Sequence, residues 1–261
     1  MSVDLSHKRV LVLGLARSGV AAARLALARG AEVVAADRRT EAELGAVARE
    51  LASAGARLAL GPHDVRVFLE ADLMVVSPGV PLALPEIAAA RRAGVQVVGE
   101  VEFASWYLGA ARVVGITGTN GKSTTTALAG CLCEASGART FAGGNLGRPL
   151  SEAALCREGY EYLVCELSSF QLEGIETLRP HVAAVTNLTP DHIDRYPSHE
   201  AYGAAKRRIF LNQTEEDAAV VNARDPATVA MAEGTRGRRF QFGFGALSGP
   251  GACMRERAMH V

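Results

Sequence analysis

Residues 112–135 read RVVGITGTNGKSTTTALAGCLCEA, which is an apolar run, a glycine-rich turn and a stretch of helix-forming residues. The run from Arg112 to Thr117 predicts a buried strand, and the stretch from Ser123 to Ala135 predicts a helix. A turn between such a strand and helix presents backbone N–H groups and the positive end of the helix dipole to an anion. The stretch therefore predicts an α/β domain with an anion-binding turn.

The turn itself predicts a binding site for the phosphates of ATP. Glycines let the backbone approach phosphate oxygens, Lys122 would reach the outer phosphates, and the hydroxyl of Ser123 would bind Mg²⁺. The strict pattern GxxxxGK[ST] fails at one position, because Ile116 stands where it requires glycine. A plain glycine-rich turn is the alternative. The predicted ATP-binding residues are Gly118, Thr119, Asn120, Gly121, Lys122, Ser123 and Thr124.

Apolar runs alternate with helical patterns along most of the chain, which is typical of parallel sheets covered by helices. We expect an α/β fold with a Rossmann-like, parallel-sheet domain at residues 1–109 and a P-loop-type ATPase domain at residues 110–261. The second domain is expected to be incomplete, because the tail from Gly245 to Val261 contains no recognisable final element. Strands are predicted at 10–13, 32–36, 73–76, 95–98, 112–117, 162–167, 181–187 and 218–222, and helices at 20–29, 41–53, 85–93, 123–135 and 200–211.

Charge and composition exclude several classes of partner. Lys plus Arg and Asp plus Glu number 28 each, so no overall field draws the chain to nucleic acid or to an anionic membrane. The N-terminus lacks the pattern of a signal peptide, and no apolar stretch reaches the roughly 18 residues that span a bilayer. A cytoplasmic protein is expected. The five cysteines show no CxxC ligand spacing and are predicted to be reduced thiols in the core.

Acidic and polar side chains follow two further predicted strands. Glu166 ends a buried strand, where a carboxylate beside a phosphate loop is placed to hold a divalent ion. The stretch from Thr186 to Tyr196 concentrates Asn, Asp and His after the next strand, which suggests ion and phosphate chemistry. A solvated acid at a strand end and an ordinary loop histidine at His192 are the alternatives.

The first predicted strand-to-helix turn, Gly14 to Gly19, invites comparison with dinucleotide-binding folds. Asp37 ends the second strand at about the distance expected of a ribose-binding acid. However, Ala16 replaces the second glycine of GxGxxG, where the backbone must approach the pyrophosphate most closely. NAD binding is therefore the weaker interpretation. Ser18 and Asp37 could also simply cap helices.

Four stretches of the chain together resemble the Mur ligase family. TGTNGKST at 117–124 is similar to the phosphate loop that these ligases share with folylpolyglutamate synthases. ELSSFQLE at 166–173 is the most discriminating of the other three, because it resembles the D-glutamate-adding members in particular. The remaining two are NLTPDHIDRYPSHEAY at 187–202 and AAKRRIF at 204–210.

The resemblance implies an ATP-dependent ligase that joins D-glutamate to UDP-N-acetylmuramoyl-L-alanine through an acyl phosphate, in the cytoplasmic synthesis of peptidoglycan precursors. It implies ATP and Mg²⁺ as cofactors, and we expect a monomer. Lys122 would act on the transferring phosphate, Glu166 and His192 would bind one Mg²⁺, and Ser123 and Glu166 would neighbour the nucleotide's metal. Lys206 would be carbamylated, which converts an ammonium into an anionic oxygen ligand.

The resemblance also implies a binding site for the UDP of the substrate in the N-terminal domain. Asn145, in the second domain, matches a family residue near the sugar nucleotide and the forming acyl group; an ordinary turn asparagine is the alternative. The residues that match the family's UDP-substrate site are Arg17, Ser18, Asp37, Arg38, Ser77, Pro78, Gly79 and Asn145.

The resemblance extends from Val10 to about Gly245 and includes no counterpart of the family's third, C-terminal Rossmann-like domain. We therefore expect a fragment with negligible turnover on its own. Two other functions stay open. A folylpolyglutamate-type ligase would share the phosphate loop, although ELSSFQLE argues against it, and a non-catalytic nucleotide-binding module would bind ATP or UDP without ligation.

Overall fold

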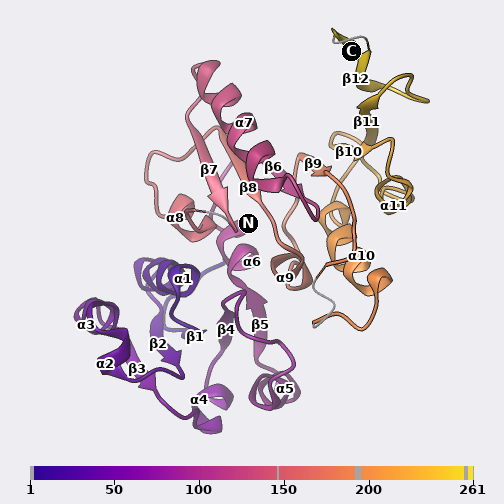
Figure 1. Ribbon diagram of the computed structural model, residues 1–261. Helices are drawn as coiled ribbons and strands as arrows, with labels where there is room; N and C mark the ends of the chain where they lie inside the picture. The colour runs from indigo at the N-terminus through magenta and orange to yellow at the C-terminus, as the bar shows by residue number, and fades with distance from the viewer. Residues whose placement is uncertain (1–2, 146, 192–194, 256–257, 261) are drawn as a thin grey trace. The chain divides into compact units, whose positions relative to one another are not determined.

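The computed structural model describes residues 3–145, 147–191, 195–255 and 258–260 (Figure 1). The chain forms two compact units, of which the first contains Met1–Gly109 with Arg148–Gly159 and the second contains Ala110–Gly147 with Tyr160–Val261. Both are α/β units built on parallel strands, which confirms the predicted fold class. The sequence predicted one domain boundary near Gly109, with residues 148–159 in the second domain. That boundary stays a prediction.

The first unit is built on a five-stranded sheet in the order β3-β2-β1-β4-β5. All four strand pairs are parallel, so the carboxyl ends of the strands meet at one edge. The strands are short and nearly continuous in apolar residues, as expected where helices cover both faces. They are β1 (Arg9–Leu13), β2 (Glu32–Asp37), β3 (Arg57–Leu60), β4 (Leu73–Val76) and β5 (Gln96–Gly99).

Seven helices belong to the described part of this unit. One is supplied by the segment 148–159, and it packs against α1 and α6. The predicted single helix at 41–53 is wrong, because Gly45 adopts φ +56° and divides it into α2 and α3. The helices are α1 (Arg17–Ala28), α2 (Glu41–Leu44), α3 (Ala46–Ser53), α4 (Val65–Leu69), α5 (Pro85–Arg92), α6 (Glu100–Ser105) and α8 (Leu150–Ala154).

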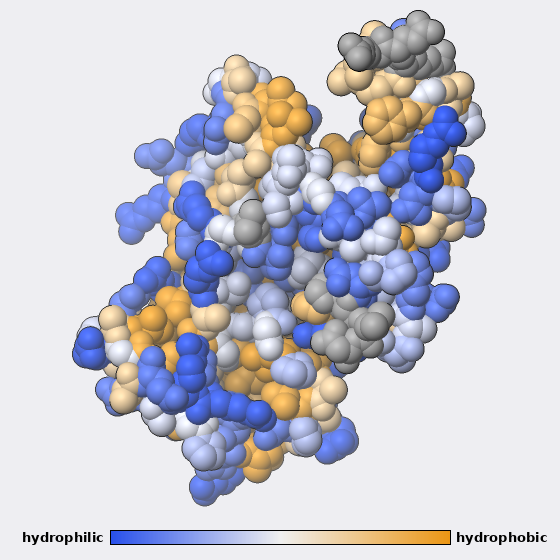
Figure 2. Space-filling model, in the orientation of Figure 1, coloured by the Kyte–Doolittle hydropathy of each residue, from blue (hydrophilic) through white to orange (hydrophobic). Residues whose placement is uncertain are grey.

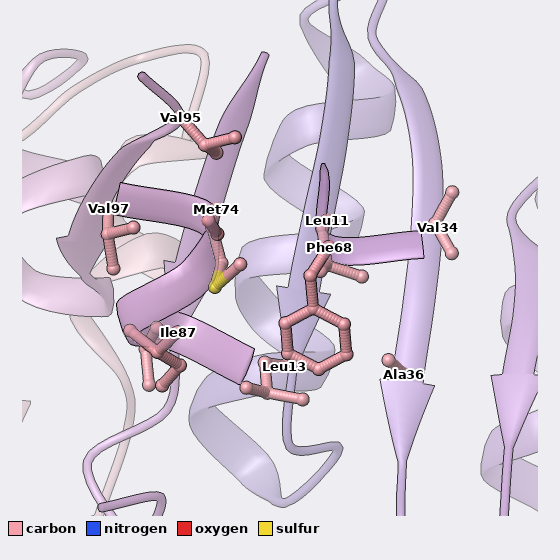
Figure 3. Close-up of a cluster of buried hydrophobic side chains, with 11 residues drawn as sticks. Leu11, Leu13, Val34, Ala36, Phe68, Met74, Ile87, Val95 and Val97 are labelled. Carbon is pink, nitrogen blue, oxygen red and sulfur yellow. The ribbon is translucent and has the colours of Figure 1, made fainter. Parts of the chain in front are cut away.

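A cluster of buried apolar side chains fills one side of this sheet (Figure 3). Phe68 of α4 and Ile87 of α5 lie over Leu11 and Leu13 of β1 and Met74 of β4, and these five side chains are almost entirely buried. Burial of a large apolar side chain contributes about 1.5–3 kcal/mol, so the cluster fixes the two short helices on the sheet. It also fixes the segments that connect them to the carboxyl edge of the strands.

The second unit is built on an eight-stranded sheet in the order β13-β12-β11-β10-β9-β6-β8-β7. Its strand pairs are parallel except for β12 with β13, which are antiparallel. The prediction that the tail has no recognisable element is wrong, because it supplies β12 and β13. The strands are β6 (Arg112–Thr117), β7 (Thr140–Gly144), β8 (Tyr162–Glu166), β9 (Val182–Val185), β10 (Ala218–Asn222), β11 (Arg238–Phe244), β12 (Gly251–Arg255) and β13 (Ala258–His260).

The helix after β6, α7 (Lys122–Ala135), buries only Thr126 and Gly130. Leu128 and Leu132 of α7 are more than half exposed, and apolar surface is visible over this helix in Figure 2. Among the described residues, no helix has the length and apolarity needed to cross a bilayer. The other helices of the unit are α9 (Ser169–Glu173), α10 (His199–Arg207), the 3-10 turn η1 (Arg208–Phe210) and α11 (Pro226–Met231).

The five cysteines are free thiols, as predicted, but they do not all lie in the core. Cys165 and Cys253 are buried, Cys133 and Cys156 are partly exposed, and Cys131 is exposed on α7. The prediction of five core thiols is therefore wrong for three of them. Cys131 and Cys133 lie on α7, whose buried residues are Thr126 and Gly130, so the apolar sequence around the two cysteines does not bury them.

Candidate functional site

The predicted phosphate loop lies between β6 and α7, at the carboxyl edge of the second sheet. Gly121 caps α7 with φ +81°, and no side chain caps the first turn of the helix. The first four N–H groups of a helix have no partner within it, so this turn offers an anion both free donors and the positive end of a dipole. The Nζ of Lys122 lies 2.8 Å from the carbonyl oxygen of Thr119, which holds the lysine across the loop.

Gly118 takes a conformation that only glycine can adopt at this position. Its φ is +143°, and a Cβ atom there would lie 1.9 Å from the Oγ1 of Thr186. The loop is pressed against the residues that follow β9, and a side chain would force the two segments apart. This contact explains why residue 118 is a glycine. The sequence had shown only that Gly118 belongs to the phosphate-loop motif.

The residues after β9 hold the loop in place. The backbone N–H of Thr119 donates to the carbonyl of Asn187 at 2.9 Å, and the N–H of Asn120 donates to the Oδ1 of Asn187 at 2.8 Å. The hydroxyl of Thr186 and the Nδ2 of Asn187 both donate to the carbonyl of Asn120, at 2.7 and 2.9 Å. The sequence suggested ion and phosphate chemistry for this stretch, and the structure gives Thr186 and Asn187 contacts that position the loop.

Glu166 connects two other predicted site residues. The hydroxyl of Ser123 donates to the Oε2 of Glu166 at 2.6 Å, and the Nδ2 of Asn145 donates to the Oε1 of Glu166 at 2.8 Å. Glu166 ends β8, Asn145 directly follows β7, and both strands lie beside each other in the sheet. The residue is only 2% exposed. The structure thus brings Ser123, Asn145 and Glu166 together, as parallel strand order requires.

The side chains of Ser123, Glu166 and Asn145 fit a small divalent cation. A hydroxyl, a carboxylate and a nearby amide are hard oxygen-bearing groups of the kind that Mg²⁺ prefers. Among the described residues no group of three His, Cys, Asp or Glu side chains gathers in the manner of a closed metal site. Mg²⁺ usually keeps several waters and binds through one or two carboxylates plus substrate phosphates, so an open site is expected. His192, the other predicted ligand, lies outside the described residues.

Lys206 lies on α10 with a side chain that is only 1% exposed. Its Nζ donates to the carbonyl oxygen of Gly118 at 2.9 Å and lies 4.5 Å from the ring centre of Tyr202. Burial and the neighbouring charge of Lys122 lower the pKa of Lys206 to about 7, although Asp191 and Glu166 oppose the shift. The sequence predicted that Lys206 belongs to the site but gave no sign of its burial.

Three aromatic residues connect α9, α10 and the loop between them. No sequence pattern had identified them as part of the site. The ring of Tyr196 stacks on Phe170 and contacts Tyr202, with ring centres 6.0 and 5.3 Å apart. The hydroxyl of Tyr196 donates to Glu173, and the hydroxyls of Tyr202 and Thr119 lie 3.4 Å apart. These contacts hold Tyr196 against α9 and α10. No spacing in the sequence indicates them, because the stacking rings come from separate elements.

The predicted UDP site lies in the first unit, at the carboxyl edge of its sheet. A pocket of about 270 Å³ there is lined by Asp37, Arg38 and Gly79 among the predicted residues. Ser77 is buried, and its hydroxyl donates to the carbonyl of Gly14 at 2.6 Å. Arg17 and Ser18 lie at the start of α1, and Pro78 follows Ser77, outside the pocket lining. The other lining residues are Leu13, Gly14, His63, Val80, Pro81 and Leu84.

The carboxylate of Asp37 accepts more hydrogen bonds than its position at a strand end suggested. Its Oδ2 accepts from the N–H of Leu15 and from the Nη2 of Arg39, at 2.7 and 2.8 Å. Its Oδ1 accepts from the N–H and the Nε of Arg39, at 2.9 and 3.0 Å. Although burial opposes ionisation, the hydrogen bonds from Arg39 and Leu15 lower the pKa of Asp37 to about 2. The carboxylate therefore stays charged, and its bond to Leu15 holds the turn between β1 and α1 in place.

Comparison with known families agrees with this arrangement. The profile of the Mur ligase middle domain matches residues 116–254, which include the phosphate loop, Asn145, Glu166 and Lys206. The profile of the Mur ligase MurD-like N-terminal domain matches residues 8–99. Both matches fall within the α/β regions described above.

The chain is also similar to curated proteins with the name "UDP-N-acetylmuramoylalanine--D-glutamate ligase". It is 59% identical over 243 residues to the protein of that name from Anaeromyxobacter dehalogenans (strain 2CP-C), covering 93% of this chain and 52% of the relative. It is 57% identical over 242 residues to that from Myxococcus xanthus (strain DK1622), covering 93% and 53%. The chain spans about half the length of the curated relatives it matches.

Solved structures show the same fold at lower sequence identity. A UDP-N-acetylmuramate:L-alanyl-gamma-D-glutamyl-meso-diaminopimelate ligase from Neisseria meningitides superposes with a TM-score of 0.63 at 19% identity, covering 91% of this chain and 78% of the other. The UDP-N-acetylmuramate-alanine ligase MurC from Thermotoga maritima gives 0.52 at 24% identity, covering 90% and 53%. Because the middle-domain profile alone matches more than half of its residues, the chain belongs to the Mur ligase family.

Proposed function

We propose that this chain is part of an ATP-dependent ligase that adds D-glutamate to UDP-N-acetylmuramoyl-L-alanine through an acyl-phosphate intermediate. The observation that carries the proposal is the contact of Ser123 and Asn145 with Glu166, at 2.6 and 2.8 Å, beside the uncapped first turn of α7. The names of the relatives that are 57–59% identical support the choice of D-glutamate and of the muramoyl-alanine substrate.

In the first step, the carboxylate of the L-alanine residue attacks the γ-phosphorus of ATP, and ADP leaves. The first-turn N–H groups of α7 bind phosphate oxygens, and Lys122 neutralises charge on the transferring phosphoryl group. Gly118 and Gly121 let the backbone approach these oxygens closely. Activation is required because a free carboxylate is a very poor acyl donor.

Ser123 and Glu166 would hold Mg²⁺ beside the nucleotide. His192 would bind an Mg²⁺ ion together with Glu166. When bound, the ion supplies positive charge to the phosphate oxygens. Glu166 orients two partners at once, because one oxygen receives the Ser123 hydroxyl and the other receives the Asn145 amide. Asn145 would thereby lie near the carboxylate that becomes the acyl phosphate.

Carbamylation of Lys206 is a separate part of the proposal. The Lys206 amine, whose pKa is lowered to about 7, is partly neutral at physiological pH and can bond the carbon of CO₂ while one proton leaves to solvent. The product carries an anionic oxygen in place of an ammonium. It would then attract the cations of the site, where the unmodified ammonium near Lys122 repels them.

In the second step, the amino group of D-glutamate attacks the acyl phosphate, and the tetrahedral intermediate loses phosphate. The pocket of the first unit, with Arg38, Gly79 and the neighbouring Ser77 and Pro78, would hold the UDP of the substrate. Arg17 at the start of α1 would pair with its phosphates. We propose a cytoplasmic monomer acting in peptidoglycan precursor synthesis.

The proposal is tested by ADP release from this chain joined to the remaining half of the Anaeromyxobacter relative. Release is expected to require both UDP-N-acetylmuramoyl-L-alanine and D-glutamate, and to fall at least 100-fold in the Lys122→Ala variant, since that cation acts on the transferring group. The Lys8→Ala variant, which changes an exposed lysine, is the control. ADP release that ignores either substrate would contradict the assignment.

A further inference from the structure

A second pocket lies in the second unit, beside the face of α10 that exposes Ala204 and Arg207. Its volume is about 380 Å³, which suits a small organic molecule. It is formed by α10, η1 with the residues that follow it, and the segment between α11 and β11, all of which belong to the same compact unit. The residues that line it are Ala204, Arg207, Arg208, Phe210, Leu211, Gln213, Met231, Gly234, Thr235 and Arg236.

The pocket lies at the amino edge of the eight-stranded sheet. The Nε2 of Gln213 donates to the carbonyls of Pro180 and Ala218, at 3.2 and 2.8 Å, and these residues stand just before β9 and at the start of β10. Arg236 lies two residues before β11. The phosphate loop follows the carboxyl end of β6, and β6, β9, β10 and β11 are parallel. An occupant of this pocket would therefore bind apart from the phosphate loop.

Three arginines line the pocket, and in the described part of the chain none of them forms an ion pair with a carboxylate. The Nη2 of Arg207 donates to the carbonyl oxygen of Glu233 at 2.7 Å. Arg208 donates to two backbone carbonyls, of which that of Leu172 lies 2.9 Å from its Nε. Arg236 is exposed. Carbonyl groups thus hold two of the guanidinium groups in place without neutralising their charge.

The rest of the polar lining does not compete for these charges. Among the described residues that line the pocket, none is acidic. The two uncharged polar side chains bond to each other, since the hydroxyl of Thr235 donates to the Oε1 of Gln213 at 3.2 Å. The pocket therefore presents positive charge that an anion can neutralise.

The other side of the pocket is apolar. It is formed by Phe210, Leu211 and Met231, and the side chain of Leu211 is 54% exposed. Covering such surface with an apolar group stabilises a complex by about 25 cal/mol per Å². A guanidinium group binds phosphate oxygens through paired hydrogen bonds, and three such groups match the nearly two negative charges of a phosphate monoester. The lining thus complements a phosphoryl group attached to an apolar body.

We infer that this pocket is a second anion site, which binds a small organic phosphate. The phosphoryl group lies at Arg207, Arg208 and Arg236, and the apolar part covers Phe210 and Leu211. The inference does not depend on the proposed ligase activity, because the pocket shares no lining residue with the phosphate loop or with the predicted UDP site.

The test is a ¹H–¹⁵N NMR titration of the whole chain with phenyl phosphate, which joins a phosphoryl group to an apolar ring. The backbone signals of Gly234 and Thr235 are expected to shift, while the signal of Gly118 reports separately on the phosphate loop. Arg236→Gln should weaken binding about tenfold, the effect of one lost hydrogen bond between charged groups. Arg238→Gln is the matched control, because Arg238 is also exposed and lies at the same edge of the sheet but outside the lining.

Two further probes test the class of ligand. Inorganic phosphate and benzoate should each bind at least tenfold more weakly than phenyl phosphate, because the first lacks the apolar part and the second carries a single charge. Leu211→Ser should weaken phenyl phosphate and leave inorganic phosphate unchanged. Equal binding of the three probes would overturn the assignment of an organic phosphate. Absence of a shift at Gly234, or equal losses in Arg236→Gln and Arg238→Gln, would overturn the site itself.

Discussion

The Nζ of Lys206 donates a hydrogen bond to the carbonyl oxygen of Gly118 across 2.9 Å, which joins α10 to the first residue of the phosphate loop. The two residues are 88 positions apart in the sequence. Few lysines are buried this deeply, since removing an ammonium from water is costly unless it is paired. Here the bond to Gly118 and the ring of Tyr202 compensate part of that cost.

Lys206 should make stability depend on pH. Its pKa is about 7 in the folded chain and about 10.5 when unfolded, so between these values the unfolded state binds more protons and stability rises with pH. Relative to Lys206→Met, the wild type should gain about 3 kcal/mol between pH 7 and pH 9.5. Urea unfolding in CO₂-free buffer measures this difference. An equal pH response in wild type and variant would contradict it, and Lys8→Met should show no such effect.

Gly118→Ala should destabilise the second unit strongly. The new Cβ would meet the Oγ1 of Thr186 at 1.9 Å, in a backbone conformation with φ +143°. We expect a loss of about 3 kcal/mol from the clash and the strained backbone together. Gly137→Ala is the matched control, since Gly137 also has a positive φ, +86°, but a Cβ added there would meet nothing within 4 Å. Equal losses by thermal or urea unfolding would show that the contact with Thr186 does not matter.

Glu100 should act on stability in the opposite sense. It is fully buried at the start of α6, its Oε1 accepts from the N–H of Ser151 at 2.7 Å, and burial raises its pKa to about 7. Because the folded chain keeps the proton longer than the unfolded one, stability falls as pH rises from about 4.5 to about 7. Glu100→Gln should therefore be more stable than wild type by about 3 kcal/mol at pH 8. Chemical unfolding at pH 5 and pH 8 tests this, with the exposed Glu32→Gln as control.

Glu166→Gln should impair the binding of ATP in the presence of Mg²⁺ more than in its absence. The change keeps the size of the side chain but removes the negative charge that a divalent cation requires. We expect at least a tenfold weaker affinity with Mg²⁺ and a change of less than threefold in EDTA, as measured by calorimetry. The exposed Glu215→Gln should match the wild type under both conditions. A variant that retains full Mg²⁺-dependent affinity would remove Glu166 from the predicted metal site.

The sequence by itself determined the features that depend on near neighbours in the chain. The apolar run Arg112–Thr117, the glycines after it and the helical stretch from Ser123 predicted the phosphate loop, because a strand, turn and helix require only local patterns. Parallel order then implied that Glu166, at the end of its strand, would lie near Ser123. Where the pattern was weak, local reasoning failed, as at Gly45 and in the tail strands β12 and β13.

Only the tertiary structure decided which side chains are buried, paired or available. The sequence could not show that Lys206 is buried against Gly118, that Asp37 is saturated by Leu15 and Arg39, or that His63 lines the pocket beside it. Burial and hydrogen bonding depend on segments brought together from distant positions, and they set the pKa values and the free donors of the site. Local sequence patterns thus predict the order of the strands and helices, whereas the neighbours of each side chain in space determine its chemistry.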